Sequence, residues 1–404
     1  MVASLTRTFG PAYLGLAEEV VQEALVQALK RWPFHGIPEK PEAWLYRVAR
    51  NLAIDRLRRE LSFRGKEIDI RESLMREPST VETSVFDGRD GGIEDDALRL
   101  VFLCCHPALP QDARVALTLK TVGGFSVPEI ARAFLSAEAT IAQRLVRAKA
   151  RIRELGLPFE LPVAPELEER LDAVLEVVYL TFNEGYAAHQ CGDLVRSDVC
   201  AEALRLAALL SNYPSTNSPV VHALLALLLF QSSRLPARVD ASGDLVLLAD
   251  QDRSLWDSRL VERGFEALDR SARGTALSPY HVQAAIAAEH AGAARSEDTD
   301  WPGILDLYDQ LLEINPSPVV ALNRAVAVAE VQGPRAGLAA LAEIEAHPAL
   351  REYYLLPATR AELLARTGAK DEAAASYRAA LELATSEPER RFLMKKLQVL
   401  TSSV

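Results

Sequence analysis

The chain has 404 residues, of which 49% are hydrophobic and 25% are charged, as in an ordinary globular protein of two or three domains. Four cysteines are too few for a disulfide scaffold, and they form no CxxC pair of the zinc-ribbon kind. The net charge of −11 is unevenly distributed. Residues 1–160 hold 23 Lys and Arg against 22 Asp and Glu, so the negative excess lies in residues 161–404. This asymmetry favours a polyanion-binding front half, although an acidic surface on the back half alone would produce it too.

Nearly the whole chain is predicted to be helical, because apolar residues recur at three- and four-residue spacing and no convincing run alternates as a strand does. The first such stretch is 14–32, LGLAEEVVQEALVQALKRW, an amphipathic helix that we expect to end at Pro33. A loop with three helix breakers follows, and Pro41 suits the first position of the next helix. The predicted fold class is all-α.

The stretch PEAWLYRVARNLAIDRLRRE (41–60) combines an apolar stripe with many arginines. On one helix the buried face can include Trp44, Leu45, Val48, Leu52 and Leu57. The other faces carry Arg47, Arg50, Arg58 and Arg59, with Asn51 and Asp55 beside them. Aromatic rings beside guanidinium groups suit a nucleic acid, because bases stack on rings while phosphates pair with arginine. A solvated basic surface is the alternative.

Residues 62–97 change character. They are rich in Ser, Thr, Gly, Asp and Glu, which predicts a flexible acidic linker with a hinge at Gly91 and Gly92. A second compact helical unit is predicted for residues 98–157. It includes CCHPALP (104–110), where adjacent cysteines and a histidine cannot readily converge on one metal ion, so we expect these residues in the core.

Residues 126–153, SVPEIARAFLSAEATIAQRLVRAKARIR, follow the pattern of a helix-turn-helix. Ser126 and Glu129 form a capping box, Ile130, Ala131 and Phe134 would pack the first helix, and Ile141, Leu145, Ala148 and Ile152 the second. In such a motif the second helix reads base edges with its first residues and contacts phosphates farther on. The base-edge candidates are Thr140, Gln143 and Arg144, and the phosphate candidates are Arg147, Lys149 and Arg151. The alternative is an ordinary helical hairpin with a basic surface.

The remaining residues, 158–404, show internal repeats. Gly333 and Gly368 lie 35 residues apart at equivalent turns, and Tyr308 and Tyr377 lie 69 apart, close to two periods of a tetratricopeptide repeat. Such a helical solenoid offers a concave surface to a protein or peptide partner.

Two polar stretches in this half could instead indicate catalysis: TFNEGYAAH (181–189), and LADQDRSLWD (248–257). Their candidate residues are Asn183, Glu184, His189, Asp250, Asp252, Arg253 and Trp256. Without a nucleophile elbow, a phosphate loop or metal-ligand spacing, we favour a buried polar network or a ligand pocket, and we expect no metal and no cofactor. The N-terminus lacks a signal-peptide pattern, and the longest apolar run (220–230) is short for a bilayer span, so we expect a buried helix and a cytoplasmic protein without a membrane partner.

The segment WLYRVARNLAIDRLRRE resembles regions 2.3 and 2.4 of the extracytoplasmic-function (ECF, group IV) sigma factors of bacterial RNA polymerase, and EEVVQEALVQAL resembles region 2.2. The resemblance implies a domain of residues 1–61 that binds core polymerase at the β′ clamp and the minus-ten promoter strand. It assigns polymerase binding to Glu19, Gln22 and Glu23. It assigns minus-ten DNA binding to Arg50, Asn51, Arg56, Arg58 and Arg59.

The ending RLVRAKARIR resembles sigma region 4, which implies minus-thirty-five binding and a β flap contact for residues 98–157. LVFLCCHPALPQDARVALTLKTVGGF is similar to a sigma subfamily with a long C-terminal extension, here a tetratricopeptide-like domain that would modulate activity. The resemblance implies a non-enzymatic initiation factor with core RNA polymerase and promoter DNA as partners. Two alternatives remain: a stand-alone helix-turn-helix regulator, or a DNA-binding front fused to a small-molecule-sensing or catalytic helical domain.

Overall fold

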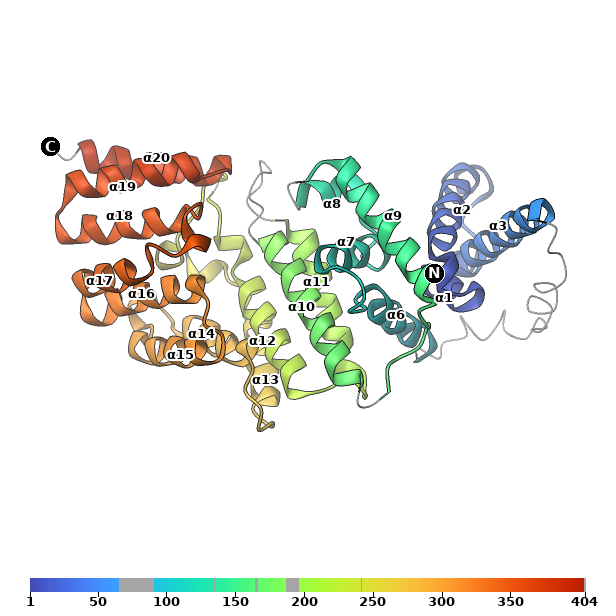
Figure 1. Ribbon diagram of the computed structural model, residues 1–404, viewed down its shortest axis with the longest axis horizontal. Coiled ribbons are helices and arrows are strands. Elements are labelled where there is room, and N and C mark those ends of the chain that lie inside the picture. The colour runs from blue at the N-terminus through green and yellow to red at the C-terminus, as the bar shows by residue number, and fades with distance from the viewer. Residues whose placement is uncertain (65–90, 134–135, 164–165, 187–195, 241, 403–404) are drawn as a thin grey trace. The chain divides into compact units, whose positions relative to one another are not determined.

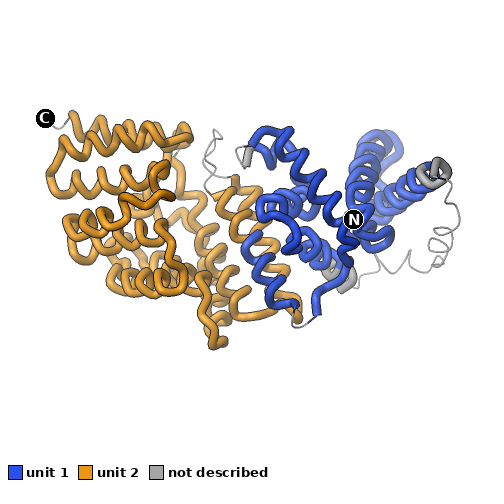
Figure 2. Tube along the Cα trace, viewed as in Figure 1, with its two compact units in different colours: residues 1–131, 136–177 blue, residues 132–135, 178–404 orange. Residues whose placement is uncertain are grey.

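The computed structural model describes residues 1–64, 91–133, 136–163, 166–186, 196–240 and 242–402. The regular secondary structure of these residues is helical, with one isolated β-bridge between Val239 and Leu245, and the predicted all-α class is confirmed. The chain divides into two compact units (Figure 2). Unit 1 comprises residues 1–131 and 136–177, and unit 2 comprises residues 178–404 together with residues 132–135.

Unit 1 is built from short and medium helices that follow one another closely in the chain (Figure 1). They are α1 (Val2–Phe9), α2 (Leu14–His35), α3 (Pro41–Arg64), α6 (Gly91–Cys104), α7 (Gln111–Thr121), α8 (Val127–Ala133) and α9 (Glu138–Leu155), with the 3₁₀ turn η1 (Pro11–Tyr13) between α1 and α2. The helix α10 (Glu166–Tyr186) begins in unit 1, which continues to Val177, and ends in unit 2.

The core between α2 and α3 depends on small residues. Ala17, Ala24 and Ala28 of α2 and Ala49 and Ala53 of α3 are all buried, and they let the two helix axes approach closely. Larger side chains close this core at its edges: Leu5, Val20, Val21 and Leu45 are buried, and Trp44, Val48 and Leu52 are partly buried against it. The apolar stripe predicted for α3 is confirmed, and the two alanines extend it.

Two helix boundaries differ from those predicted. Helix α2 continues to His35 with Pro33 inside its last turn, where the missing proline N–H costs only one hydrogen bond close to the helix end. Gly91 and Gly92, predicted as a hinge, form the first turn of α6. Glu94, Asp95 and Asp96 follow them, and acidic residues favour the N-terminal turn of a helix. The rest of the predicted linker, residues 65–90, lies outside the described residues.

Unit 2 continues as a series of helices in which each packs on the next (Figure 1). After α10 these are α11 (Ser197–Asn212), α12 (Pro219–Ser233), α13 (Ser258–Ser271), α14 (Pro279–Gly292), α15 (Trp301–Ile314), α16 (Pro318–Gln332), α17 (Pro334–Ile344), α18 (Leu355–Thr367), α19 (Lys370–Leu383) and α20 (Glu387–Ser402). The 3₁₀ turns η3 (Leu248–Asp250) and η4 (Arg253–Leu255) lie between α12 and α13.

The predicted turns at Gly333 and Gly368 separate packed helices. Gly333 joins α16 to α17 with a φ of 93°, and Gly368 ends α18 before α19 with a φ of 86°, backbone conformations that L side chains rarely adopt. The second helices of three successive pairs, α15, α17 and α19, place Tyr308, Leu341 and Tyr377 at the same position counted from the helix start. The repeat seen in the sequence is therefore a repeat of helix pairs.

The apolar run predicted as a buried helix lies in α12. The stretch Pro219–Ala237 is long and apolar enough, by length and composition alone, to cross a membrane. However, 72% of its most apolar window is buried inside the structure, including Leu224, Leu228 and Phe230. Burial of this extent is what a core helix shows, because a membrane-spanning helix would present apolar side chains to lipid.

Candidate nucleic-acid and polymerase interface

The face of α3 opposite the core carries most of the predicted minus-ten residues. Asn51, Arg58 and Arg59 are exposed, and Arg50 is half-buried. They stay on the outside because Leu45, Ala49 and Ala53 turn the other side of the helix toward α2. An amide and several guanidinium groups on one exposed helix can contact bases and phosphates without any change in the packing beneath them.

Arg56 differs from the other predicted minus-ten residues because it is held by two carboxylates of α2. Its guanidinium group donates to Glu19 and to Glu23, each at 2.6 Å. These are two of the three predicted polymerase-binding residues, and the third, Gln22, is exposed between them. The pairs are solvent-accessible, so they contribute about 0–1 kcal/mol and can exchange for other partners at small cost.

The second half of α2 has apolar side chains that face solvent, and the sequence analysis did not single them out. Leu25, Val26 and Leu29 are exposed on the helix, Leu29 with an exposed fraction of 76%, and Phe34 and Ile37 follow at 84% and 71%. These five residues are called the α2 apolar surface below. The signal was available in the sequence, because Leu25, Val26 and Leu29 fall outside the stripe of Val21, Ala24 and Ala28. Exposed apolar groups gathered on one element mark an interaction surface.

The two helices predicted for the helix-turn-helix are present as α8 and α9. The capping box is complete: the Glu129 carboxylate accepts from the Ser126 N–H at 2.7 Å, and the Glu129 N–H donates to the Ser126 hydroxyl at 3.3 Å. Ile130 and Ala131 of α8 are buried, as are the four predicted core residues of α9, Ile141, Leu145, Ala148 and Ile152. Phe134 lies outside the described residues.

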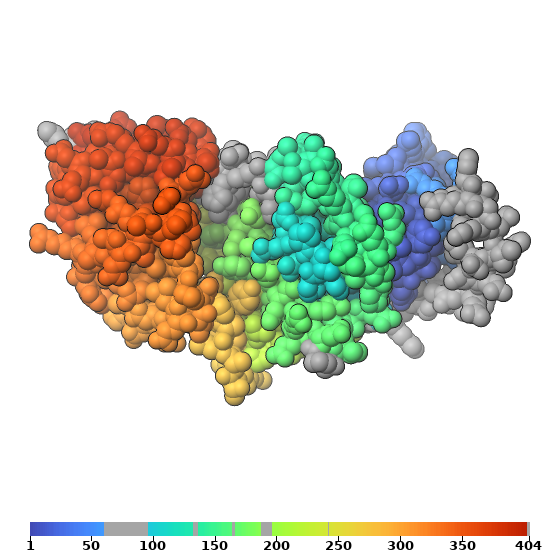
Figure 3. Space-filling view, viewed as in Figure 1, coloured from blue at the N-terminus to red at the C-terminus, as the bar shows by residue number. Residues whose placement is uncertain are grey.

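The predicted DNA-contacting residues of α9 divide into free and paired groups. Thr140, Gln143, Arg147 and Arg151 are exposed, and within the described part of the chain Arg151 alone of these has a nearby carboxylate, Glu154 at 3.9 Å. Arg144 forms an ion pair of 2.9 Å with Asp112 of α7. The free residues lie on the outer side of α9, which reaches the surface together with α8 (Figure 3).

Lys149, the remaining phosphate candidate, is bound by Glu18 of α2. The Glu18 side chain is only 11% exposed, and its other oxygen accepts from the Thr121 hydroxyl of α7 at 2.6 Å. One carboxylate thus ties α2 to two helices of the helix-turn-helix region. Nothing in the local sequence marks Glu18 for this role, because Thr121 and Lys149 lie 103 and 131 positions away from it.

The cysteines of CCHPALP are part of the core, as predicted. Cys104 and Cys105 are fully buried, and the Cys105 sulfur lies 3.4 Å from the Thr118 hydroxyl. Burial raises the pKa of Cys105 to about 12 and raises that of Cys104 as well. Among the described residues no group of three or more His, Cys, Asp or Glu side chains is placed to hold a metal ion.

The first turns of α10 bind directly to α6 and α7 within unit 1. Arg170 donates to the Phe102 carbonyl at 2.9 Å and its guanidinium lies 5.8 Å from the centre of the Phe102 ring. Glu176 accepts from Gln111 at 2.7 Å and lies 3.6 Å from Arg114. The first part of α10, up to Val177, therefore belongs to the same compact unit as α9, although it follows the boundary predicted at residue 157.

Three residues of the two polar stretches considered for catalysis, Glu184, Asp252 and Arg253, have structural partners. Asp252 caps η4 by accepting from the Ser254 N–H at 2.9 Å, and hydrogen bonding by the Ser254 side chain and then by this N–H lowers the pKa of Asp252. Arg253 donates to backbone carbonyls of His290 and Ala293. Glu184 also has an interaction partner, and His189 lies outside the described residues. Trp256 contributes to a cavity in unit 2.

Comparison with known proteins agrees with the layout of the helices. The family described as Sigma-70 region 2 matches residues 1–62, Sigma-70, region 4 matches residues 99–152, and the Family of unknown function (DUF6596) matches residues 170–272. No solved structure matches the chain with significance.

The relatives fall into two groups. Uncharacterized protein R00370 of Rhizobium meliloti (strain 1021) is 44% identical over 392 residues, which cover 96% of this chain and 91% of that protein. The ECF RNA polymerase sigma-E factor of Escherichia coli (strain K12) is 29% identical over 155 residues, or 37% of this chain and 78% of that protein, and its counterpart in Salmonella typhimurium (strain LT2) is 28% identical over the same length. This chain therefore belongs to one family with Uncharacterized protein R00370, and its front domains make it a sigma factor of the ECF type with a DUF6596 domain behind them.

Proposed function

We propose that this sigma factor divides its work among three surfaces of unit 1: α2 docks on the β′ clamp of core RNA polymerase, α3 holds the opened minus-ten strand, and α9 reads the minus-thirty-five duplex. The observation that carries the proposal is the exposed polar and basic side of α3 and α9, each opposite a fully packed apolar side. Regions 2 and 4 supply the partners, core polymerase and promoter DNA.

The α2 apolar surface supports the polymerase contact. It provides the hydrophobic area that a specific interface needs, while Glu19, Gln22 and Glu23 supply a polar rim beside it. Binding through this face would take Glu19 and Glu23 away from Arg56, so that the guanidinium becomes available to the minus-ten strand beside Arg50, Asn51, Arg58 and Arg59. Polymerase docking and DNA binding are then linked, because Arg56 exchanges its ion pairs with Glu19 and Glu23 for contacts with the minus-ten strand.

The minus-thirty-five contact draws on free and paired residues of α9. Thr140 and Gln143 are accessible for base edges, and Arg147 and Arg151 for phosphates. Arg144 must leave Asp112 to reach a base edge, and Lys149 must leave Glu18 to reach a phosphate. DNA binding by α9 therefore competes with contacts made inside unit 1. The ion pairs of Arg144 with Asp112 and of Lys149 with Glu18 weaken DNA binding by the protein that is not bound to polymerase.

The C-terminal helices are proposed to modulate this activity as a tetratricopeptide-like domain with a protein or peptide partner. The repeated helix pairs around Gly333 and Gly368 support a tetratricopeptide-like domain, because stacked pairs of this kind build a solenoid. The contacts of Arg170 and Glu176 in α10 with α6 and α7 support a modulating role, since they connect the start of the extension to the helices of region 4. Nothing in this role calls for catalysis.

The proposal is tested by separating polymerase binding from promoter opening. The double variant Glu19→Lys and Glu23→Lys should weaken the complex with core polymerase in a pull-down, whereas Glu39→Lys, a charge reversal in the exposed loop before α3, should not. Asn51→Ala should keep core binding and reduce permanganate reactivity of the open complex about 2- to 10-fold, the value of one lost hydrogen bond. An unchanged permanganate pattern would remove Asn51 from the minus-ten site.

A further inference from the structure

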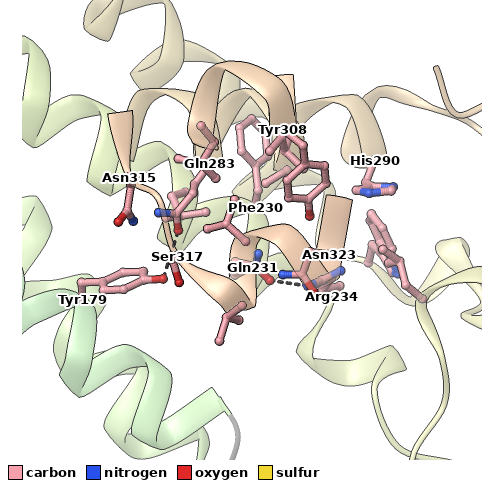
Figure 4. Close-up of a pocket in the computed structure, with 18 residues that line it drawn as sticks. Tyr179, Phe230, Gln231, Arg234, Gln283, His290, Tyr308, Asn315, Ser317 and Asn323 are labelled. Carbon is pink, nitrogen blue, oxygen red and sulfur yellow. Dashed lines mark hydrogen bonds between the residues drawn. The ribbon is translucent and has the colours of Figure 1, made fainter. Parts of the chain in front are cut away.

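Unit 2 encloses a cavity of about 520 Å³ between α12, α14, α15 and the start of α16 (Figure 4). Tyr179 of α10 and Trp256, from the segment between η4 and α13, close two of its sides. A volume of this size is ordinary for a site that takes a small organic molecule. Seven of the 18 lining residues lie in the part of the chain that the DUF6596 family covers, and the other eleven lie between Gln283 and Asn323.

The cavity contains one unpaired cation. Arg234, at the end of α12, donates through one Nη to Gln231, while its Nε is buried without a hydrogen-bond partner. Among the described residues no carboxylate pairs with Arg234, and the lining contains no Asp or Glu. Burial lowers the pKa of Arg234, since a charged group out of water is disfavoured unless a partner compensates it.

The other polar groups of the lining do not compensate this charge. Tyr186, which lies outside the lining, has its ring centre 5.5 Å from the Arg234 guanidinium and offers an aromatic ring and a hydroxyl but no carboxylate. His290 is neutral at pH 7, because burial and the charges of Arg234 and Arg253 lower its pKa to about 4. The positive charge therefore faces the cavity without an anion to neutralise it.

The walls around Arg234 fit a flat organic body with polar substituents. Tyr179, Phe230, Trp256 and Tyr308 contribute rings, and amide groups come from Gln231, Gln283, Asn315 and Asn323. The Tyr179 hydroxyl donates to Gln283 at 3.0 Å, which orients one amide in the free site. Aromatic walls with a few convergent polar groups are typical of cavities that recognise one class of small molecule.

We propose that this cavity is a binding site for a small organic anion, a carboxylate or phosphate joined to an aromatic or similarly flat apolar body, with the anionic group against Arg234. The anion supplies the charge partner that the guanidinium lacks in the free structure, and the body fills the space between the rings. The site gives the C-terminal extension a chemical input that is separate from polymerase and promoter, and it stands whether or not the roles proposed for α2, α3 and α9 hold.

Calorimetry and tryptophan fluorescence with the full chain test the proposal. The probes are 1-naphthoate and 1-naphthyl phosphate, with neutral 1-naphthamide as the matched control. At least one anion should bind about tenfold or more tightly than the amide, which is what one charge-assisted contact gives. The stronger anion identifies the chemical class. Equal binding of all three probes, or binding of none, would overturn the proposal.

Three variants locate the site. Arg234→Gln should abolish the preference for the anion over the amide. Arg238→Gln, which removes a guanidinium that also stacks on Tyr186 but does not line the cavity, should change affinity by less than about threefold. Ala287→Phe fills the cavity from α14 without altering charge and should abolish binding of all probes, which keeps the test decisive where Arg234→Gln does not fold. Full anion binding by a folded Ala287→Phe variant would place the probes elsewhere.

Discussion

Arg56, Arg144 and Lys149 are held by carboxylates of unit 1, whereas Asn51, Arg58, Arg59 and Arg147 are exposed, and Arg151 is exposed with Glu154 at 3.9 Å. Residue spacing on a helix was enough to predict which side chains leave the core. It could not predict the pairs, because Glu18 and Lys149 are 131 positions apart and their contact depends on how η1, the turn before α2, packs on α9. Accessible and paired basic residues should therefore respond differently to substitution.

Arg144→Ala and Arg151→Ala should separate sequence reading from general affinity. Loss of Arg144 should cost about 1–3 kcal/mol on the cognate minus-thirty-five duplex if it contacts a guanine edge, and little on scrambled DNA. Loss of exposed Arg151 should weaken binding to both duplexes. It should also reduce the slope of log K against the logarithm of salt concentration by about one. Fluorescence anisotropy at several salt concentrations measures both effects. Equal losses of Arg144→Ala on cognate and scrambled DNA would count against base readout.

The cysteines provide a pH-dependent prediction at the same scale. Burial raises the pKa of Cys105 and of Cys200 to about 12, so at pH 8 each is a thiolate in only about one molecule in 10,000. In the folded protein these thiols should resist iodoacetamide from pH 7 to pH 9, and they should react once the chain is unfolded in urea. Peptide mapping by mass spectrometry reads the modification, and rapid labelling of native Cys105 would show that its surroundings are open.

At the scale of elements, the sequence predicted helix identity better than helix ends. The stripe of α3, the capping box of α8 and the turns at Gly333 and Gly368 follow from local rules, and all of them are present. Pro33 lies inside α2 and Gly91 and Gly92 lie inside α6, because neighbouring residues override what one proline or glycine favours alone. A ligand pocket was one interpretation of the stretch that contains Trp256, but its lining could not be predicted, since it comes from five helices and from loops between them.

Glu18→Gln tests whether the contact between α2 and α9 restrains DNA binding. The amide can still accept from Thr121 but carries no charge to hold Lys149, so Lys149 should become available to phosphate. Binding of the free protein to non-specific duplex should tighten, and its salt dependence should rise by about one ion. Glu160→Gln, at an exposed position after α9, controls for the change in net charge. An identical salt slope for both variants would show that Lys149 is not restrained in solution.

On the scale of the whole molecule, the extension is joined to region 4 by the first turns of α10, which makes unit 1 larger than the two sigma regions alone. The boundary predicted at residue 157 lies at the start of the segment GLPFELPVAPE (156–166), which has three prolines, and the sequence offered no sign that the next helix packs back on α6. Truncation close to that boundary would remove Arg170 and Glu176 from a packed face, so substitutions in the full chain are the sounder experiment.

Arg170→Ala should weaken this attachment. The variant loses a hydrogen bond from a half-buried guanidinium to the Phe102 carbonyl and the contact with the Phe102 ring, which together are worth about 1–2 kcal/mol after allowance for solvent. The first unfolding transition in calorimetry should move to lower temperature. Arg259→Ala, an exposed arginine of α13, is the control. A transition that stays in place would show that α10 is not bound to α6 in solution.

The central claim is that the chain directs core RNA polymerase to promoters through unit 1, and run-off transcription with purified core polymerase tests it most directly. Promoter fragments selected by the full chain from a random library should yield a transcript of defined start. Asn51→Ala and Arg144→Ala should each lower its amount while co-elution with core polymerase persists. A folded chain that binds duplex DNA but neither co-elutes with core polymerase nor gives any run-off transcript would contradict the account and identify a stand-alone DNA-binding regulator.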